Sequence, residues 1–169
     1  MQKLNEEPVP PFEQLKRTHT CGELRASDIG KKVTLNGWVS GYRNLGGVLF
    51  LDLRDRYGVT QIVVDPQTIP AEMLAEAERA RAEFVVAAVG TVRRRPEGTV
   101  NPKLATGEIE LAVESFHVLA ESKTPPFEID TAETVNEQLR LEYRYLDLRR
   151  HSLQEALRLR HELSLAVRN

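Results

Sequence analysis

The sequence predicts an all-β fold with added helices: a five-stranded barrel carrying one helix between its third and fourth strands, followed by a linker and a carboxy-terminal helical segment. The first observation behind this is the alternation over residues 46–64, which is typical of two strands joined by a tight turn. Leu49, Leu51 and Leu53 fall on one face and Phe50 on the other. The second observation is the order of the expected elements, and the third is a change of composition near residue 120.

The expected elements follow one another simply. Residues 1–16, rich in proline and glutamate, are expected to be a flexible leader. Gly37, inside the first strand, predicts a bulge or sharp bend there. A short helix is expected after Pro70, because proline suits the first helical turn. The strands are expected at about 33–43, 48–54, 59–65, 84–94 and 108–119, and the helix at 71–81.

Five strands with a helix between the third and fourth are the element order of an OB-fold, which binds oligonucleotides on the face of strands two and three. This domain is expected over residues 17–120. A linker follows over 121–136, where Pro125 and Pro126 disfavour helix. Residues 137–169 are expected to form hinge helices and the start of a truncated further domain.

Composition excludes several classes of protein. A single cysteine precludes an intrachain disulfide, and the four scattered histidines lack the spacing of a metal site. The absence of a long apolar run or signal peptide predicts a cytoplasmic protein with no membrane partner. A net charge of −2 argues against a charge-driven DNA coat but allows a local basic patch. Candidates for that patch are Arg43, Arg54, Arg56 and the run 93–95.

The last segment has apolar residues at helical spacing that nothing else in the sequence is expected to cover. This pattern continues to Asn169 without a capping residue, which predicts an amino-terminal fragment of a longer protein. The apolar positions are Ala156, Leu159, Leu163, Ala166 and Val167.

Several ordered motifs resemble the opening of bacterial-type aspartyl-tRNA synthetases, which are class II enzymes. They lie at residues 17–24, 37–39, 46–56, 105–110, 123–127 and 143–150. The resemblance implies an OB domain that reads the anticodon of aspartate tRNA, then a hinge, then a catalytic domain. It further implies ATP, magnesium and a homodimer for the full-length aspartate–tRNA ligase. The catalytic motifs are missing here, so we expect no catalytic residue, no metal site, no cofactor and no ligase activity in this chain alone.

The resemblance also assigns RNA-binding roles to five residues. Phe50 would stack on an anticodon base, and Gln61 would form paired hydrogen bonds to the middle base, uridine. Glu110 would accept from the two adjacent N–H groups of guanine at the first position. Arg43 and Arg95 would lie near the backbone and the third base. The alternatives are simple exposed packing for Phe50 and a solvated strand-edge charge for Glu110.

Two further positions bear on whether the parent enzyme charges asparagine tRNA as well. Relaxed relatives often have histidine where this chain has Leu45, so leucine favours a discriminating enzyme, and the second such position, Thr99, fits neither pattern. One departure lies at 41–42, Gly-Tyr, where many relatives have two arginines.

The sequence leaves some roles and functions open. Trp38 is interpreted equally as barrel packing or binding, and Arg54 and Asp55 as structural partners of the turn after strand two. The rival functions are a free-standing OB module for single-stranded nucleic acid and a scaffold that dimerises through its carboxy-terminal stripe.

Overall fold

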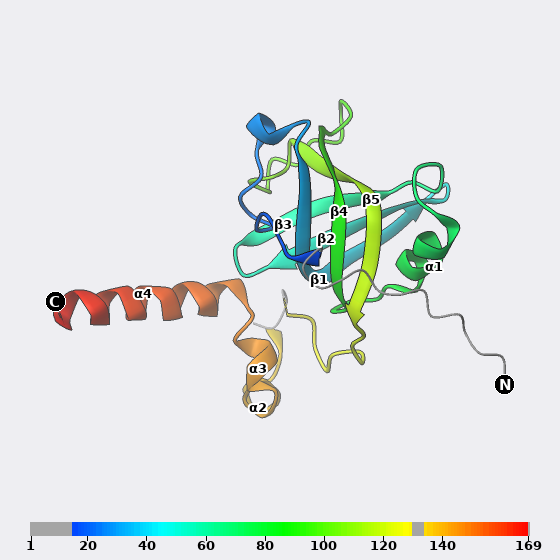
Figure 1. Ribbon diagram of the computed structural model, residues 1–169. Coiled ribbons are helices and arrows are strands. Elements are labelled where there is room, and N and C mark those ends of the chain that lie inside the picture. The colour runs from blue at the N-terminus through cyan, green and yellow to red at the C-terminus, as the bar shows by residue number, and fades with distance from the viewer. Residues whose placement is uncertain (1–14, 130–133, 169) are drawn as a thin grey trace. The chain divides into compact units, whose positions relative to one another are not determined.

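The computed structural model describes residues 15–129 and 134–168, shown in Figure 1. The chain forms two compact units, residues 1–123 and 124–169. Most of the expected leader, residues 1–14, lies outside the described residues, and so do residues 130–133 of the expected linker. No described helix is both long enough and apolar enough to cross a membrane.

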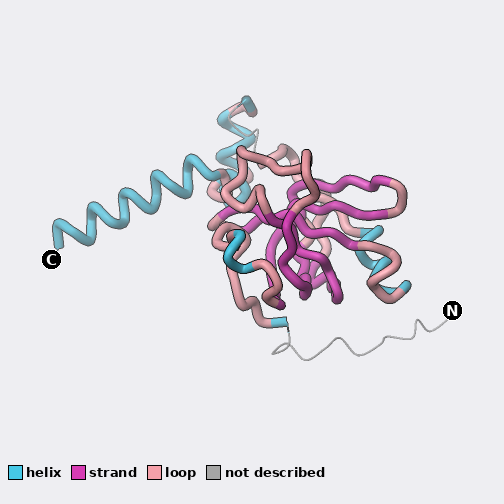
Figure 2. Tube along the Cα trace, turned by 90° about the horizontal axis from the view of Figure 1, so that it is seen from above, coloured by secondary structure: helices cyan, strands magenta, loops and turns pink. Residues whose placement is uncertain are grey.

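The first unit is a closed barrel of five strands, which confirms the predicted fold class (Figures 1 and 2). The strands are β1 (Lys32–Leu45), β2 (Val48–Asp55), β3 (Gly58–Val64), β4 (Val85–Arg94) and β5 (Ile109–Ala120). They neighbour one another in the order β1-β2-β3-β5-β4, and β4 closes back on β1. All these pairings are antiparallel except that of β3 with β5. Closure removes exposed sheet edges and places residues far apart in sequence side by side.

The predicted bulge at Gly37 is wrong in position. The register between β1 and β2 shifts between Val39 and Gly41, two residues later. Gly37 is required for a different reason: a Cβ there would lie 2.5 Å from the carbonyl oxygen of Arg54 on the paired strand. Gly37 therefore permits the close approach of the β1 and β2 backbones. The β-bulge itself lies further along β1, between Val39 and Gly41.

One face of every strand fills the barrel with apolar side chains. The helix between β3 and β4, α1 (Ala71–Arg79), packs on β5 and contributes the buried Ala77. Glu76 fixes its orientation, because its carboxylate accepts the backbone N–H of Val118 at 2.8 Å. A 3-10 turn, η2 (Ala26–Asp28), precedes β1. The fully buried side chains include Leu24, Leu35, Leu49, Leu51, Leu53, Ile62, Leu111 and Phe116.

The second unit is helical, with α2 (Glu137–Glu142), α3 (Arg144–Asp147) and α4 (His151–Arg168). Asn136 caps α2, since its side chain accepts the N–H of Gln138 at 2.8 Å. A small apolar cluster forms around Phe127, Ile129 and Leu146. In contrast, α4 has no buried residue, and most of its apolar side chains are exposed, including Leu157, Leu159, Leu163, Leu165 and Val167.

Candidate nucleic-acid interface

The outer face of strands β1, β2 and β3 carries most of the predicted RNA-binding residues. Arg43 of β1 pairs with Phe50 of β2, which pairs with Val63 of β3. Further along, Asp52 of β2 pairs with Gln61 of β3. The alternate β2 residues are core leucines, so these side chains share the opposite, outward face.

A continuous chain of hydrogen bonds crosses this face. Nη2 of Arg43 donates to the two carboxylate oxygens of Asp52 at 3.2 and 3.3 Å and to Oε1 of Gln61 at 3.2 Å. Nε2 of Gln61 donates to Oε2 of Glu110 at 3.0 Å. Nε of Arg93 donates to Oε1 of Glu110 at 2.8 Å. The fold thus brings together three predicted site residues from three strands and adds Asp52 and Arg93 to them.

Glu110 is buried, which corrects the interpretation of a solvated strand-edge charge. Its neighbours Ile109 and Leu111 point into the core as predicted, so Glu110 is on the outer face. Even so, the residue is only 1% exposed. Gln61 and Arg93, on the flanking strands, each bond one of its carboxylate oxygens. A buried carboxylate needs such partners, because it has lost its hydration.

Gln61 and Phe50 differ in their exposure to solvent. Gln61 is 7% exposed, and its amide is oriented by Glu110 on the nitrogen side and Arg43 on the oxygen side. An amide with both ends held has a defined donor and acceptor direction. Phe50 is only half-buried, between Arg43 and Val63 on the adjacent strands. The outer face therefore combines an accessible aromatic ring with a fixed polar pattern beside it.

Arg95, which is expected near the RNA backbone and the third base, is held by protein groups in this structure. It is 5% exposed, and its Nε donates to the carbonyl of Ile109 at 2.9 Å. Its Nη1 donates to the carbonyl of Thr99 at 3.5 Å, while Nη2 is buried and has no hydrogen-bond partner within the described chain. Burial lowers the pKa of Arg95, and the nearby Glu110 opposes that shift. In this geometry Arg95 organises the loop between β4 and β5.

The two predicted discrimination positions lie in loops. Leu45 ends β1 and is 65% exposed. The turn that follows is made by Gly46 and Gly47, with φ values of +62° and +92° that favour glycine. Thr99 is exposed in the loop between β4 and β5, where its N–H and hydroxyl both donate to the carbonyl of Pro96. Both side chains therefore remain available to a ligand.

Arg54 and Asp55, interpreted as structural partners, both have partners within the protein. Arg54 pairs with Glu83 at 2.6 Å. Asp55 accepts the backbone N–H groups of Tyr57 and Gly58 in the turn, and that of Cys21 at 2.8 Å. The carboxylate thereby ties the segment before β1 to the β2–β3 turn.

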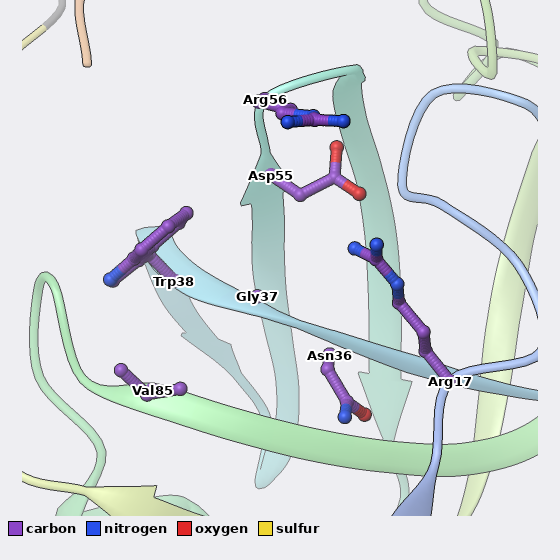
Figure 3. Close-up of a pocket in the computed structure, with 7 residues that line it drawn as sticks. All are labelled: Arg17, Asn36, Gly37, Trp38, Asp55, Arg56 and Val85. Carbon is purple, nitrogen blue, oxygen red and sulfur yellow. The ribbon is translucent and has the colours of Figure 1, made fainter. Parts of the chain in front are cut away.

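A cavity that was not predicted from the sequence lies where β1 pairs with the carboxy-terminal end of β2. Its volume is about 310 Å³. Figure 3 shows its lining, with the indole of Trp38 on one side and the guanidinium of Arg17 directed towards Asp55. Trp38 pairs with Arg54, whereas Arg43 pairs with Phe50, so the cavity and the Phe50 site are at opposite ends of the β1–β2 ladder. Trp38 is half-buried and lines this cavity rather than the barrel core.

The arrangement suits recognition of an unpaired base. A half-buried ring can stack on a base with its accessible surface, and an oriented amide beside it can hydrogen-bond to a base edge. No group of three histidine, cysteine, aspartate or glutamate residues in the described ranges is arranged to hold a metal ion.

Fold and site together define a class of protein. The family described as OB-fold nucleic acid binding domain matches residues 33–119, which comprise about half of the chain and all but the first residue of β1 and the last residue of β5 in the barrel strands. The chain belongs to this family.

Comparison with individual proteins gives a narrower likeness than the domain family does. The chain is 57% identical over 155 residues to the aspartate–tRNA(Asp/Asn) ligase of Moorella thermoacetica, covering 92% of this chain and 26% of that protein. It is 52% identical to the ligase of the same name from Desulfatibacillum aliphaticivorans, covering 91% and 26%. Among solved structures, it resembles asparaginyl-tRNA synthetase from Pyrococcus horikoshii complexed with asparaginyl-adenylate, with a TM-score of 0.75, 28% identity and coverage of 89% and 33%. The chain spans about a quarter of the length of the curated relatives it matches.

Proposed function

We propose that this chain reads the anticodon of aspartate tRNA as the amino-terminal part of an aspartate–tRNA ligase. The observation that carries the proposal is the outer face of β1–β3, where Phe50 lies beside the chain of polar contacts through Arg43, Gln61 and Glu110. An aromatic ring with fixed donors and acceptors next to it is how proteins read splayed-out bases of RNA.

The residue roles follow from this geometry. Phe50 stacks on a base, because its ring is the accessible aromatic surface of the face. Gln61 presents its remaining amide hydrogen and lone pair to the middle base, and Glu110 accepts from the first base. Arg43 stays beside the RNA backbone. Arg95 acts indirectly, by holding the loop that contains Thr99.

The parent's activity is inferred from its relatives. The high identity to aspartate–tRNA ligases supports ATP-dependent attachment of aspartate to tRNA, with ATP and magnesium bound outside residues 1–169. The exposed apolar side chains of α4 support a homodimer of the full-length enzyme. A cytoplasmic location is part of the same proposal.

The relatives also bear on tRNA specificity. Leu45 favours an enzyme restricted to aspartate tRNA, whereas the relatives are named as ligases for both aspartate and asparagine tRNA. Identity over 155 residues carries more weight than one position, so we propose that the parent charges both tRNAs. This proposal predicts similar affinities for two stem-loops that differ only in C or U at the third anticodon base.

The test is binding of an aspartate-tRNA anticodon stem-loop to the 169-residue chain, measured by fluorescence anisotropy at several salt concentrations. We expect modest affinity that falls with salt, with a shallower slope than that of a DNA-coating protein. We also expect no aspartate-dependent ATP–pyrophosphate exchange.

Two outcomes would contradict the proposal. Equal affinity for the stem-loop and for unrelated single strands of the same length would favour a free-standing module without anticodon specificity. Robust exchange by the pure chain would show that the chain is itself catalytic.

A further inference from the structure

In the free protein, Glu110 is closed off from any base. The residue is 1% exposed, and each of its oxygens already accepts a hydrogen bond, one from Arg93 and one from Gln61. Guanine presents two N–H donors side by side, so pairing with it requires that both carboxylate oxygens be reachable. Each oxygen has a second lone pair, so guanine can bind while one of the two covering side chains stays, but the other must leave to expose the carboxylate.

Of the two, Arg93 is the side chain that can leave. Its side chain is 50% exposed, whereas Gln61 is 7% exposed and is also held by Arg43. Arg93 and Glu110 are direct cross-strand partners in the β4–β5 ladder. Rotation of the arginine side chain into solvent would uncover the carboxylate without moving either strand.

We infer that Arg93 is a removable cover for Glu110, and that guanine at the first anticodon position takes its place. This inference rests on the proposed function. The ion pair between Arg93 and Glu110 is exchanged for the two N–H donors of the base. Because a bare buried carboxylate is unfavourable, the cover leaves only when a base supplies donors in its place. Uridine has one ring N–H and cannot replace it.

The cover lowers apparent affinity for the correct base. If only a fraction of the free molecules have Glu110 open, the observed affinity for guanine is reduced by that fraction. Removing the cover should therefore tighten binding of a loop with guanine at the first position. A loop with uridine there never opens the cover and should gain nothing.

The chain offers a matched pair of variants for the test. Arg93→Ala removes the cover, and Arg94→Ala removes the same charge from the next residue of β4, which is also exposed. Dissociation constants are measured for two stem-loops that are identical except for G or U at the first anticodon base. The ratio of the two constants cancels the general loss of positive charge.

We expect the preference for G over U to rise about three- to tenfold in Arg93→Ala. In Arg94→Ala it should stay within about twofold of the wild type. Thermal unfolding of each variant establishes that it is folded. Should Arg93→Ala be unfolded, Arg93→Thr serves instead, because threonine is better suited to a strand.

The opposite results separate this inference from the proposed function. If the wild-type chain prefers G but the preference is unchanged or falls in the folded Arg93 variant, the cover is wrong and anticodon reading stands. If the wild-type chain binds neither stem-loop, the proposed function fails, and the cover fails with it.

Discussion

The two faces of the β2–β3 hairpin are built from the same strands for different purposes. The inner face consists of fully buried leucines and Ile62, packed with side chains of every other strand. The outer face is also largely buried at Gln61, yet by polar partners rather than apolar ones. Gln61 is thus nearly as buried as the core residues, but only the outer face has hydrogen-bonding groups that a ligand could use. The difference shows that burial alone does not separate core from site: the chemistry of the partners does.

The largest effect is expected on the inner face. Leu51→Ala removes a fully buried side chain and leaves a cavity, which should destabilise the fold by about 2–5 kcal/mol. Denaturant unfolding followed by circular dichroism measures this loss. Wherever the variant remains folded, its preference among anticodon bases should match that of the wild type, and a changed preference would contradict the division between the faces.

Phe50→Ala, one residue away, tests the outer face. Loss of one base stack should weaken stem-loop binding by about 1–3 kcal/mol. Stability should change little, because the side chain points away from the core. Binding and unfolding are measured on the same preparation. Unfolding as severe as that of Leu51→Ala would place Phe50 in the core and remove the stacking surface from the account.

A smaller and more selective effect is expected from Glu110→Gln. A neutral amide offers one acceptor and one donor where the carboxylate offered two acceptors, so the preference for guanine at the first base should weaken by about 1 kcal/mol. The measurement uses stem-loops with each of the four bases at that position. Glu108→Gln, an exposed carboxylate two residues earlier, is the control. An unchanged base preference in Glu110→Gln would exclude it from the readout.

The smallest effect is expected at Leu45, on the turn beyond the sheet. Leu45→His changes an exposed side chain, so stability should stay within about 0.5 kcal/mol. Any gap in affinity between stem-loops with C or U at the third base should narrow. An unchanged gap would exclude Leu45 from third-base specificity, and a gap that widens would contradict the expected role of histidine at this position.

The fold could be predicted from the sequence because its signals are local. Alternation over residues 48–64 and proline before α1 give each element's type, and the strand boundaries differ from those expected by one or two residues. Gly37 was misinterpreted since a glycine in a strand signals either a bulge or a close approach, and only the position of the Arg54 carbonyl distinguishes them.

The site could be predicted only in part, because its contacts are not local. Alternation placed Phe50, Gln61 and Glu110 on the outer face. It could not show that Glu110 is closed off, since the partners that cover it come from β3 and β4 and meet it only when the barrel closes. The buried guanidinium of Arg95 likewise depends on carbonyl groups of the β4–β5 loop and of β5.

The most direct test of the central claim, that the outer face of β2–β3 contacts the anticodon, is photocrosslinking with a stem-loop whose middle base is a thiouridine. The account predicts crosslinks within residues 49–64, at or beside Phe50 and Gln61, and their loss when unmodified stem-loop competes. Crosslinks confined to the cavity around Trp38, or to α4, would contradict it.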